Sequence, residues 1–152
     1  MSVFVEELLK NSIILYSENH HMCKIDMKEF LKINIQKWKF NRPPDELRVE
    51  EIANNLIEKK YPLSFIFQCI YNKDKNCLEL IDGQHRYYVI QKIQEYTKKE
   101  FNEKNEINEW FYKSTLLIEL KLNHTEKEIK DWFCVLNQIV PCLLYTSDAA
   151  DE

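Results

Sequence analysis

One stretch decides the fold of this chain, Leu78-Glu79-Leu80-Ile81-Asp82-Gly83-Gln84-His85-Arg86-Tyr87. It opens on an apolar run that is typical of a short buried strand. Beyond it, Val89, Ile90 and Ile93 have the spacing of a helix that is buried on one side. Gly83 is the single glycine of the chain, whereas average usage predicts on the order of ten. The stretch therefore predicts a strand, a turn that requires glycine, and a helix.

The predicted turn places groups that bind anions at the start of the helix. The first turn of a helix has unpaired N–H groups and a positive dipole end, which together attract phosphates. Gly83 allows close approach of the backbone, and Gln84, His85 and Arg86 add side-chain donors. Asp82 either caps the helix or holds a hydroxyl or a metal-bound water. The alternative is a plain helix start, with Asp82 as N-cap and solvated neighbours.

The same residues resemble the signature of a known family. Ile81 to Arg86, followed by an apolar helix, resembles the DGQHR-type proteins of the ParB/sulfiredoxin-like superfamily. The likeness continues upstream in Asn41-Arg42-Pro43, a helix around 49–53 and a strand from Leu63, and covers roughly residues 24–140. It implies an α+β fold, with a small mixed sheet flanked by helices in a single domain.

The resemblance implies that the turn binds nucleotide phosphates. ParB-type members bind and hydrolyse CTP through an Arg-Arg pair at this place, and sulfiredoxins use ATP with Gly-Gly-Cys-His-Arg. Gln84 stands where sulfiredoxins have their cysteine, so sulfiredoxin activity is not expected, and His85 replaces the first ParB arginine. The implied ligand is an NTP, CTP or ATP, with Mg²⁺, in an NTPase switch of DNA segregation, modification or defence.

The resemblance also suggests roles for single side chains. The catalytic candidates are Asp82, His85 and Arg86, of which His85 and Arg86 grip the phosphates while Asp82 positions Mg²⁺ or the attacking water. Arg42 precedes two prolines on a fixed, extended backbone and is expected to close on the phosphates from the side. The candidate pocket-lining residues are Asn41, Asn137 and Gln138.

Several alternatives remain open. The chain is either such a nucleotide-binding domain, or a non-enzymatic module that binds DNA backbone or an acidic peptide, or the amino-terminal part of a larger nuclease or nickase. In the last case DNA is contacted through a missing C-terminal region. Asn137 and Gln138 also fit a polar helix end, and Arg42 fits a surface arginine packed on Trp38. The sequence does not indicate an oligomeric state.

Composition indicates a soluble, intracellular chain of the cytoplasm. Apolar residues make up 45%, charged residues 30%, and mean hydropathy is -0.49, which excludes a disordered chain. We expect no membrane span. The five cysteines form no Cys-x-x-Cys pair or cluster with histidine, so no metal site is predicted. Cys69 and Cys77 flank a predicted hairpin turn and either face each other on its strands or are separate buried thiols.

The last residues, 142–152, differ in composition from the rest. They hold two of the three alanines and resemble the read-through translation of a transposon adapter, so we expect that the natural protein continues past Pro141. Without their three acids the net charge of -4 becomes about -1, which does not favour general polyanion binding. The expected organisation is an extension over 1–22, the ParB/sulfiredoxin-like domain over 23–141 and a non-native tail over 142–152.

Periodicity and capping residues predict the remaining elements. A capping box at 125–128 predicts the start of the last helix. In chain order, the pattern predicts a helix over 5–9, an edge strand over 13–15, a strand over 22–27, a helix from 44, a central strand over 63–71 that forms a hairpin with 77–81, a loop or short solvated helix over 98–109, a half-buried strand over 110–122 and a helix from 125.

Overall fold

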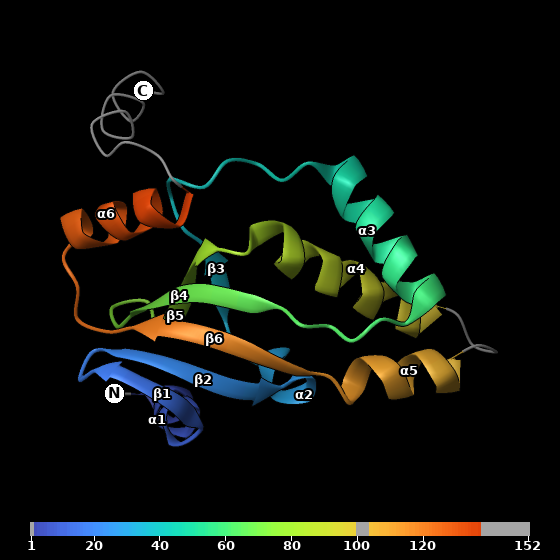
Figure 1. Ribbon diagram of the computed structural model, residues 1–152, viewed down its shortest axis with the longest axis horizontal. Coiled ribbons are helices and arrows are strands. Elements are labelled where there is room, and N and C mark those ends of the chain that lie inside the picture. Colours follow the sequence, from blue (N-terminus) through green and yellow to red (C-terminus); the bar gives the residue numbers. More distant parts are fainter. Residues whose placement is uncertain (1, 100–103, 138–152) are drawn as a thin grey trace.

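A six-stranded mixed sheet runs through the molecule (Figure 1). This computed structural model describes residues 2–99 and 104–137. The strands are β1 (Ser12–Ser17), β2 (His20–Asp26), β3 (Ile35–Lys37), β4 (Ile66–Asn72), β5 (Cys77–Asp82) and β6 (Thr115–Lys121). Their order is β1-β2-β6-β4-β5-β3, with β4 parallel to β6, β3 parallel to β5, and the other neighbours antiparallel. The predicted mixed α+β class is confirmed, whereas the ParB/sulfiredoxin-like fold stays a prediction.

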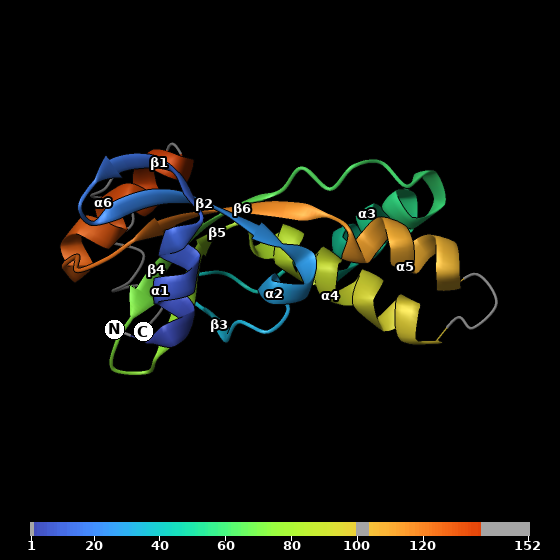
Figure 2. The same ribbon diagram turned by 90° about the horizontal axis from the view of Figure 1, so that it is seen from below.

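Helices cover the two faces of the sheet unequally (Figure 2). The helices are α1 (Val3–Lys10), α2 (Met27–Phe30), α3 (Glu46–Lys59), α4 (Gln84–Lys99), α5 (Lys104–Tyr112) and α6 (Glu126–Asn137). The first five contribute side chains to one large apolar cluster with alternate residues of the strands. A second, smaller cluster joins α6 to the opposite face. Since α6 is the one described helix on that face, part of the sheet there stays open.

The stretch from β5 to α4 has the predicted form. β5 ends at Asp82 and α4 begins at Gln84, with Gly83 between them at a φ of +102°. A Cβ on Gly83 would lie 2.9 Å from the Cδ1 atom of Phe67 and 3.4 Å from the carbonyl oxygen of Ile66. Glycine is therefore required both by the backbone angle and by the close approach of β4.

Most other predicted elements are confirmed, including the central position of β4 and its hairpin with β5. Asp45 caps α3 by accepting a hydrogen bond from the N–H of Arg48. Thr125 and Glu128 form the capping box of α6. The described part of the expected extension, residues 2–22, supplies α1 and β1, and β1 extends the same sheet.

The last strand begins later than the sequence pattern indicates. Trp110 belongs to α5, and β6 starts only at Thr115. The apolar run of 110–112 is helical because Ile107 and Phe111, four positions apart, are both buried on one side of α5. Residues 104–112 thus form a helix of the core and not a solvated segment.

The cysteines at the β4–β5 hairpin do not face each other. Cys69 lies opposite Leu80 in the ladder, and Cys77 lies opposite Asn72. Both are free and fully buried thiols. Of the two alternatives for these cysteines, the structure therefore shows separate buried thiols.

Burial makes the thiols of Cys23 and Cys69 unreactive in the folded chain. Desolvation raises the pKa of Cys23 to about 11, and it raises the pKa of Cys69 as well. At pH 8 the thiolate fraction of Cys23 is then on the order of 10² lower than that of an ordinary cysteine. We expect iodoacetamide to label Cys23 and Cys69 only after guanidinium is added, which peptide mapping by mass spectrometry measures. Labelling of Cys23 in native buffer at the rate of a free cysteine would contradict this.

Candidate functional site

The start of α4 lacks a side-chain cap. The residue before the helix is Gly83, which has no side-chain oxygen, and the first N–H that is paired within the helix is that of Tyr87, 2.9 Å from the Gly83 carbonyl oxygen. Among the hydrogen bonds of the described residues, none uses the N–H groups of residues 84–86. These donors and the helix dipole give a positive potential that suits an anion.

Arg86 is fixed beside this helix end. Its Nη1 donates to the carbonyl oxygen of Ile66 at the start of β4, and its Nη2 lies 3.4 Å from Asp82 Oδ2. The side chain is still 38% exposed, so the guanidinium keeps donors toward solvent. Asp82 orients Arg86 in this arrangement, and because the pair is partly open to solvent it adds little to stability.

Residues 38–45, here called the strap, cross the start of α4 between β3 and α3 (Figure 1). Gln84 donates through Nε2 to the carbonyl oxygen of Arg42 at 2.5 Å. His85 accepts the N–H of Asp45 on its Nε2 at 3.1 Å, which requires the neutral ring with the proton on Nδ1. Asn41 donates through Nδ2 to the Leu80 carbonyl oxygen at 2.5 Å. Arg42 is therefore held next to α4, with an exposed side chain.

His85 and Arg86 do not point to one shared partner. His85 contacts the strap, whereas Arg86 contacts β4 and Asp82. Successive residues of a helix diverge by about 100° around its axis, so neighbouring side chains reach different segments. Arg86 thus lies beside the start of α4 without a side-chain cap, and His85 holds the strap, so a joint grip of both on one phosphate stays a prediction.

Of the two pocket-lining candidates near the end of the last helix, Asn137 and Gln138, the structure describes only Asn137. Asn137 ends α6, and its Nδ2 donates to the carbonyl oxygen of Phe133 at 2.9 Å. This bond within its own helix fits the polar helix end that was the alternative for Asn137. Gln138 lies outside the described residues.

Two cavities adjoin these elements. The first, about 80 Å³, lies along α4 and is lined in part by Lys37, Gln84 and Tyr88. It is smaller than the roughly 300–1,000 Å³ of typical ligand pockets, so it does not hold a whole nucleotide. The second is a groove of about 730 Å³, which is within that range. The residues that line the groove are Lys60, Pro62, Leu63, Ser64, Phe65, Ile66, Glu109, Trp110, Lys113, Ser114, Thr115 and Leu117.

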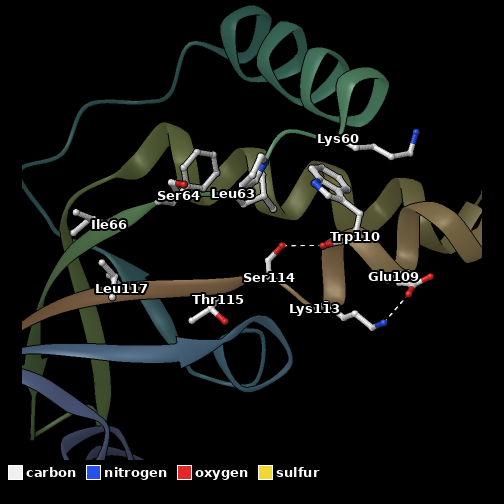
Figure 3. Close-up of a pocket in the computed structure, with 12 residues that line it drawn as sticks. Lys60, Leu63, Ser64, Ile66, Glu109, Trp110, Lys113, Ser114, Thr115 and Leu117 are labelled. Atoms are coloured by element: carbon white, nitrogen blue, oxygen red, sulfur yellow. Dashed lines mark hydrogen bonds and ion pairs between the residues drawn. The ribbon is translucent and has the colours of Figure 1, made fainter.

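The groove lies between the segment before β4 and the segment from α5 to β6 (Figure 3). Trp110 forms one wall and donates through Nε1 to the carbonyl oxygen of Tyr61 at 2.9 Å. Lys113 pairs with Glu109 at 2.6 Å along the rim. Ile66 connects the groove to the start of α4, because its carbonyl oxygen binds Arg86 while the residue lines the groove.

No protein-family model, curated protein or solved structure matches this chain. The likeness to the ParB/sulfiredoxin-like superfamily thus stays a prediction from the motif, and function has to be inferred from the geometry of the chain itself.

The site offers little for a bound metal ion. In residues 2–99 and 104–137, no three side chains of His, Cys, Asp or Glu lie together as metal ligands. Asp82 is a single carboxylate that is already paired with Arg86, so Mg²⁺ would have to arrive with the phosphates of a nucleotide. Across the same described residues, no helix has the length and apolar character needed to cross a bilayer.

Sequence reasoning missed two parts of the site. The carbonyl oxygen of Ile66 is a backbone group, and no residue type signals its role as the anchor of Arg86. The groove arises where β4 and β6 meet α5, and its wall residue Trp110 was assigned to a strand. A search for apolar residues at helical spacing that includes Ile107 and Phe111 would have placed Trp110 on α5.

Proposed function

We propose that this chain is a nucleotide-binding domain that holds phosphates at the start of α4 and the rest of the nucleotide in the adjoining groove. The observation that carries the proposal is the helix start without a side-chain cap beside the anchored guanidinium of Arg86. The ligand is an NTP, CTP or ATP, with Mg²⁺ bound to its phosphates, as the motif resemblance implies. Arg42, on the strap, adds the second positive charge.

The groove supports the part of the proposal that concerns the base and sugar of the nucleotide. Its volume fits a ligand of nucleotide size, and its wall includes the aromatic side chain of Trp110, on which a base can stack. Ile66 contacts Arg86 at the start of α4 and also lines the groove. No other described element therefore separates the phosphate half from the groove half, and one ligand can span both. Asp82 is engaged with Arg86, and the proposal is therefore restricted to binding.

Calorimetry with CTP, ATP and GTP in Mg²⁺ tests the proposal. We expect at least one nucleotide to bind, and Arg86→Ala to weaken that binding by about 10- to 100-fold, because a hydrogen bond to a charged group contributes roughly 1.5–3 kcal/mol. Lys92→Ala is the matched control, since it removes one exposed positive charge from α4 two turns further on. No heat with any of the three nucleotides would remove the proposal.

A groove variant separates the two halves. Ser64 is exposed at the groove, so Ser64→Trp is expected to fill it and to weaken nucleotide binding while inorganic triphosphate still binds. A gel shift with duplex DNA over a range of salt concentrations tests the competing module. DNA binding that falls steeply with salt and needs no nucleotide would favour a DNA-backbone binder instead.

A further inference from the structure

The ring of His124 lies between two segments that are far apart in the sequence. It follows β6 and precedes α6, and its side chain is 17% exposed. Its Nδ1 lies 3.3 Å from Oε2 of Glu128 in the first turn of α6. Its Nε2 lies 3.3 Å from the carbonyl oxygen of Asn19, in the turn between β1 and β2. The ring thus bridges the start of α6 and the β1–β2 turn.

The two oxygens that face this ring can accept hydrogen bonds but cannot donate them. Thr125 donates its N–H and its hydroxyl to Oε1 of Glu128 at 3.1 and 2.9 Å. These bonds and the contact with His124 lower the pKa of Glu128, so its side chain stays a carboxylate where histidines titrate. The carbonyl oxygen of Asn19 also accepts the N–H of Leu122 at 2.8 Å. Both acceptors are therefore held in place beside the ring.

This arrangement distinguishes His124 from the other three histidines of the chain. His85 accepts a main-chain N–H on Nε2, which requires the neutral ring. His21 has the Ser12 hydroxyl beside Nδ1 and a carbonyl oxygen beside Nε2, and the neutral ring satisfies both. His20 contacts a carboxylate through Nε2, for which one proton suffices. In contrast, His124 can donate to both of its partners only when both ring nitrogens are protonated.

We propose that His124 is a pH-dependent clamp, which joins the β1–β2 turn to the start of α6 when it is protonated and opens one of its two contacts when it is neutral. A neutral imidazole has a single N–H, so its other nitrogen would direct a lone pair at an acceptor. The clamp is therefore closed below the pH range in which histidine titrates and opens as the pH rises through that range. This inference goes beyond the nucleotide site and does not depend on it.

Other charged groups face the clamp from the elements around it. Desolvation lowers the pKa of Lys121 on β6, and the carboxylates of Glu119 and Glu128 act against this effect. Glu119 also pairs with His20 of β2 at 2.6 Å. The positive end of the α6 dipole opposes a charge on His124, whereas the acids of the first turn of α6 favour it. Because His20 is a second histidine in this region, a variant at His124 is needed to assign a pH effect to the clamp.

Amide hydrogen exchange of the full chain at about pH 5 and about pH 8, the two ends of the histidine range, tests the clamp. The reporter is the N–H of Leu122, which donates to the Asn19 carbonyl oxygen. Its protection factor compares the exchange rate with that of an unfolded peptide at the same pH. We expect about tenfold higher protection at the lower pH, because a hydrogen bond to a charged group is stronger than a neutral one. The N–H of Leu31, which donates to the Met27 carbonyl oxygen, is the internal reference and should not change.

Two variants separate the clamp from a purely structural role of the ring. His124→Gln has no titratable group, so the protection of Leu122 is expected to be equal at both pH values. Glu128→Gln keeps an oxygen for the capping box and places an N–H beside Nδ1. That N–H can donate to the neutral ring, so the clamp is expected to stay closed at about pH 8.

His21→Gln is the matched control, because His21 belongs to the same region and is satisfied as a neutral ring. It is expected to keep the pH dependence of the wild type. Three results would each overturn the proposal: equal protection of Leu122 at both pH values in the wild type, a pH dependence that persists in His124→Gln, or a Glu128→Gln variant that loses protection at the higher pH as the wild type does.

Discussion

Gly83→Ala is expected to lower the free energy of unfolding by about 2–5 kcal/mol. Two costs add at this position. A side chain at a φ of +102° forces a backbone region that costs about 1–2 kcal/mol. The new methyl group would also lie 2.9 Å from Phe67 Cδ1, and such overpacking costs about 1–3 kcal/mol. Phe67 is fully buried, so its ring has no solvent side to move into.

Urea denaturation of a double-mutant cycle separates these two costs. Phe67→Leu removes the ring atoms that the methyl group meets, so Gly83→Ala is expected to cost less in the Phe67→Leu background than in the wild type. The remaining cost measures the backbone angle. A change of less than about 0.5 kcal/mol for Gly83→Ala, the range of ordinary surface substitutions, would show that the turn is not as tight as described.

Trp38→Ala is expected to lower the free energy of unfolding by about 3–5 kcal/mol. Trp38 is 2% exposed and lies at the start of the strap. Its ring centroid is 4.9 Å from that of Phe40 and 5.1 Å from that of Phe133 on α6. The substitution therefore leaves a cavity in the small cluster that holds both α6 and the strap.

Trp38 stabilises the small apolar cluster and also holds the strap, and each role is measured by a separate experiment. Urea denaturation measures the stability loss, and hydrogen exchange of the Asp45 amide, which donates to His85, reports on the strap. We expect faster exchange at Asp45 in Trp38→Ala. Gln36→Ala, at an exposed position of β3, is the control and should change stability by no more than about 0.5 kcal/mol. Unchanged exchange at Asp45 would mean that the strap does not depend on Trp38.

The elements that could be predicted from the sequence are those with local signals. Gly83 between an apolar run and a helical pattern predicted β5, the turn and α4, and the helix predicted from residue 44 corresponds to α3, which begins at Glu46. Trp110 was misplaced because a short apolar run has no period that separates a helix end from a strand. The register of Cys69 could not be predicted either, because it depends on where the β4–β5 turn begins, and from there the ladder runs regularly from Asn72 opposite Cys77 to Cys69 opposite Leu80.

In the candidate site, too, local sequence signals could be read in advance, whereas contacts between distant segments could not. Residues 82–86 lie at a strand, turn and helix start as predicted, since that arrangement depends on neighbours in the chain. Their partners are backbone groups of Arg42, Asp45 and Ile66, which lie 20 to 42 positions away. Backbone groups have no residue-specific signal, so neither the separate partners of His85 and Arg86 nor the strap contacts could be predicted.

The place of β6 in the sheet has a consequence for synthesis on the ribosome. The β1–β2 and β4–β5 hairpins leave the ribosome early, but β6, which lies between β2 and β4, is made near the end of the described chain. Until Thr115–Lys121 has emerged, each hairpin keeps an open edge that can pair wrongly with another nascent chain. A pause in translation before that strand has emerged would therefore prolong the aggregation-prone stage, whereas a pause after its emergence would not.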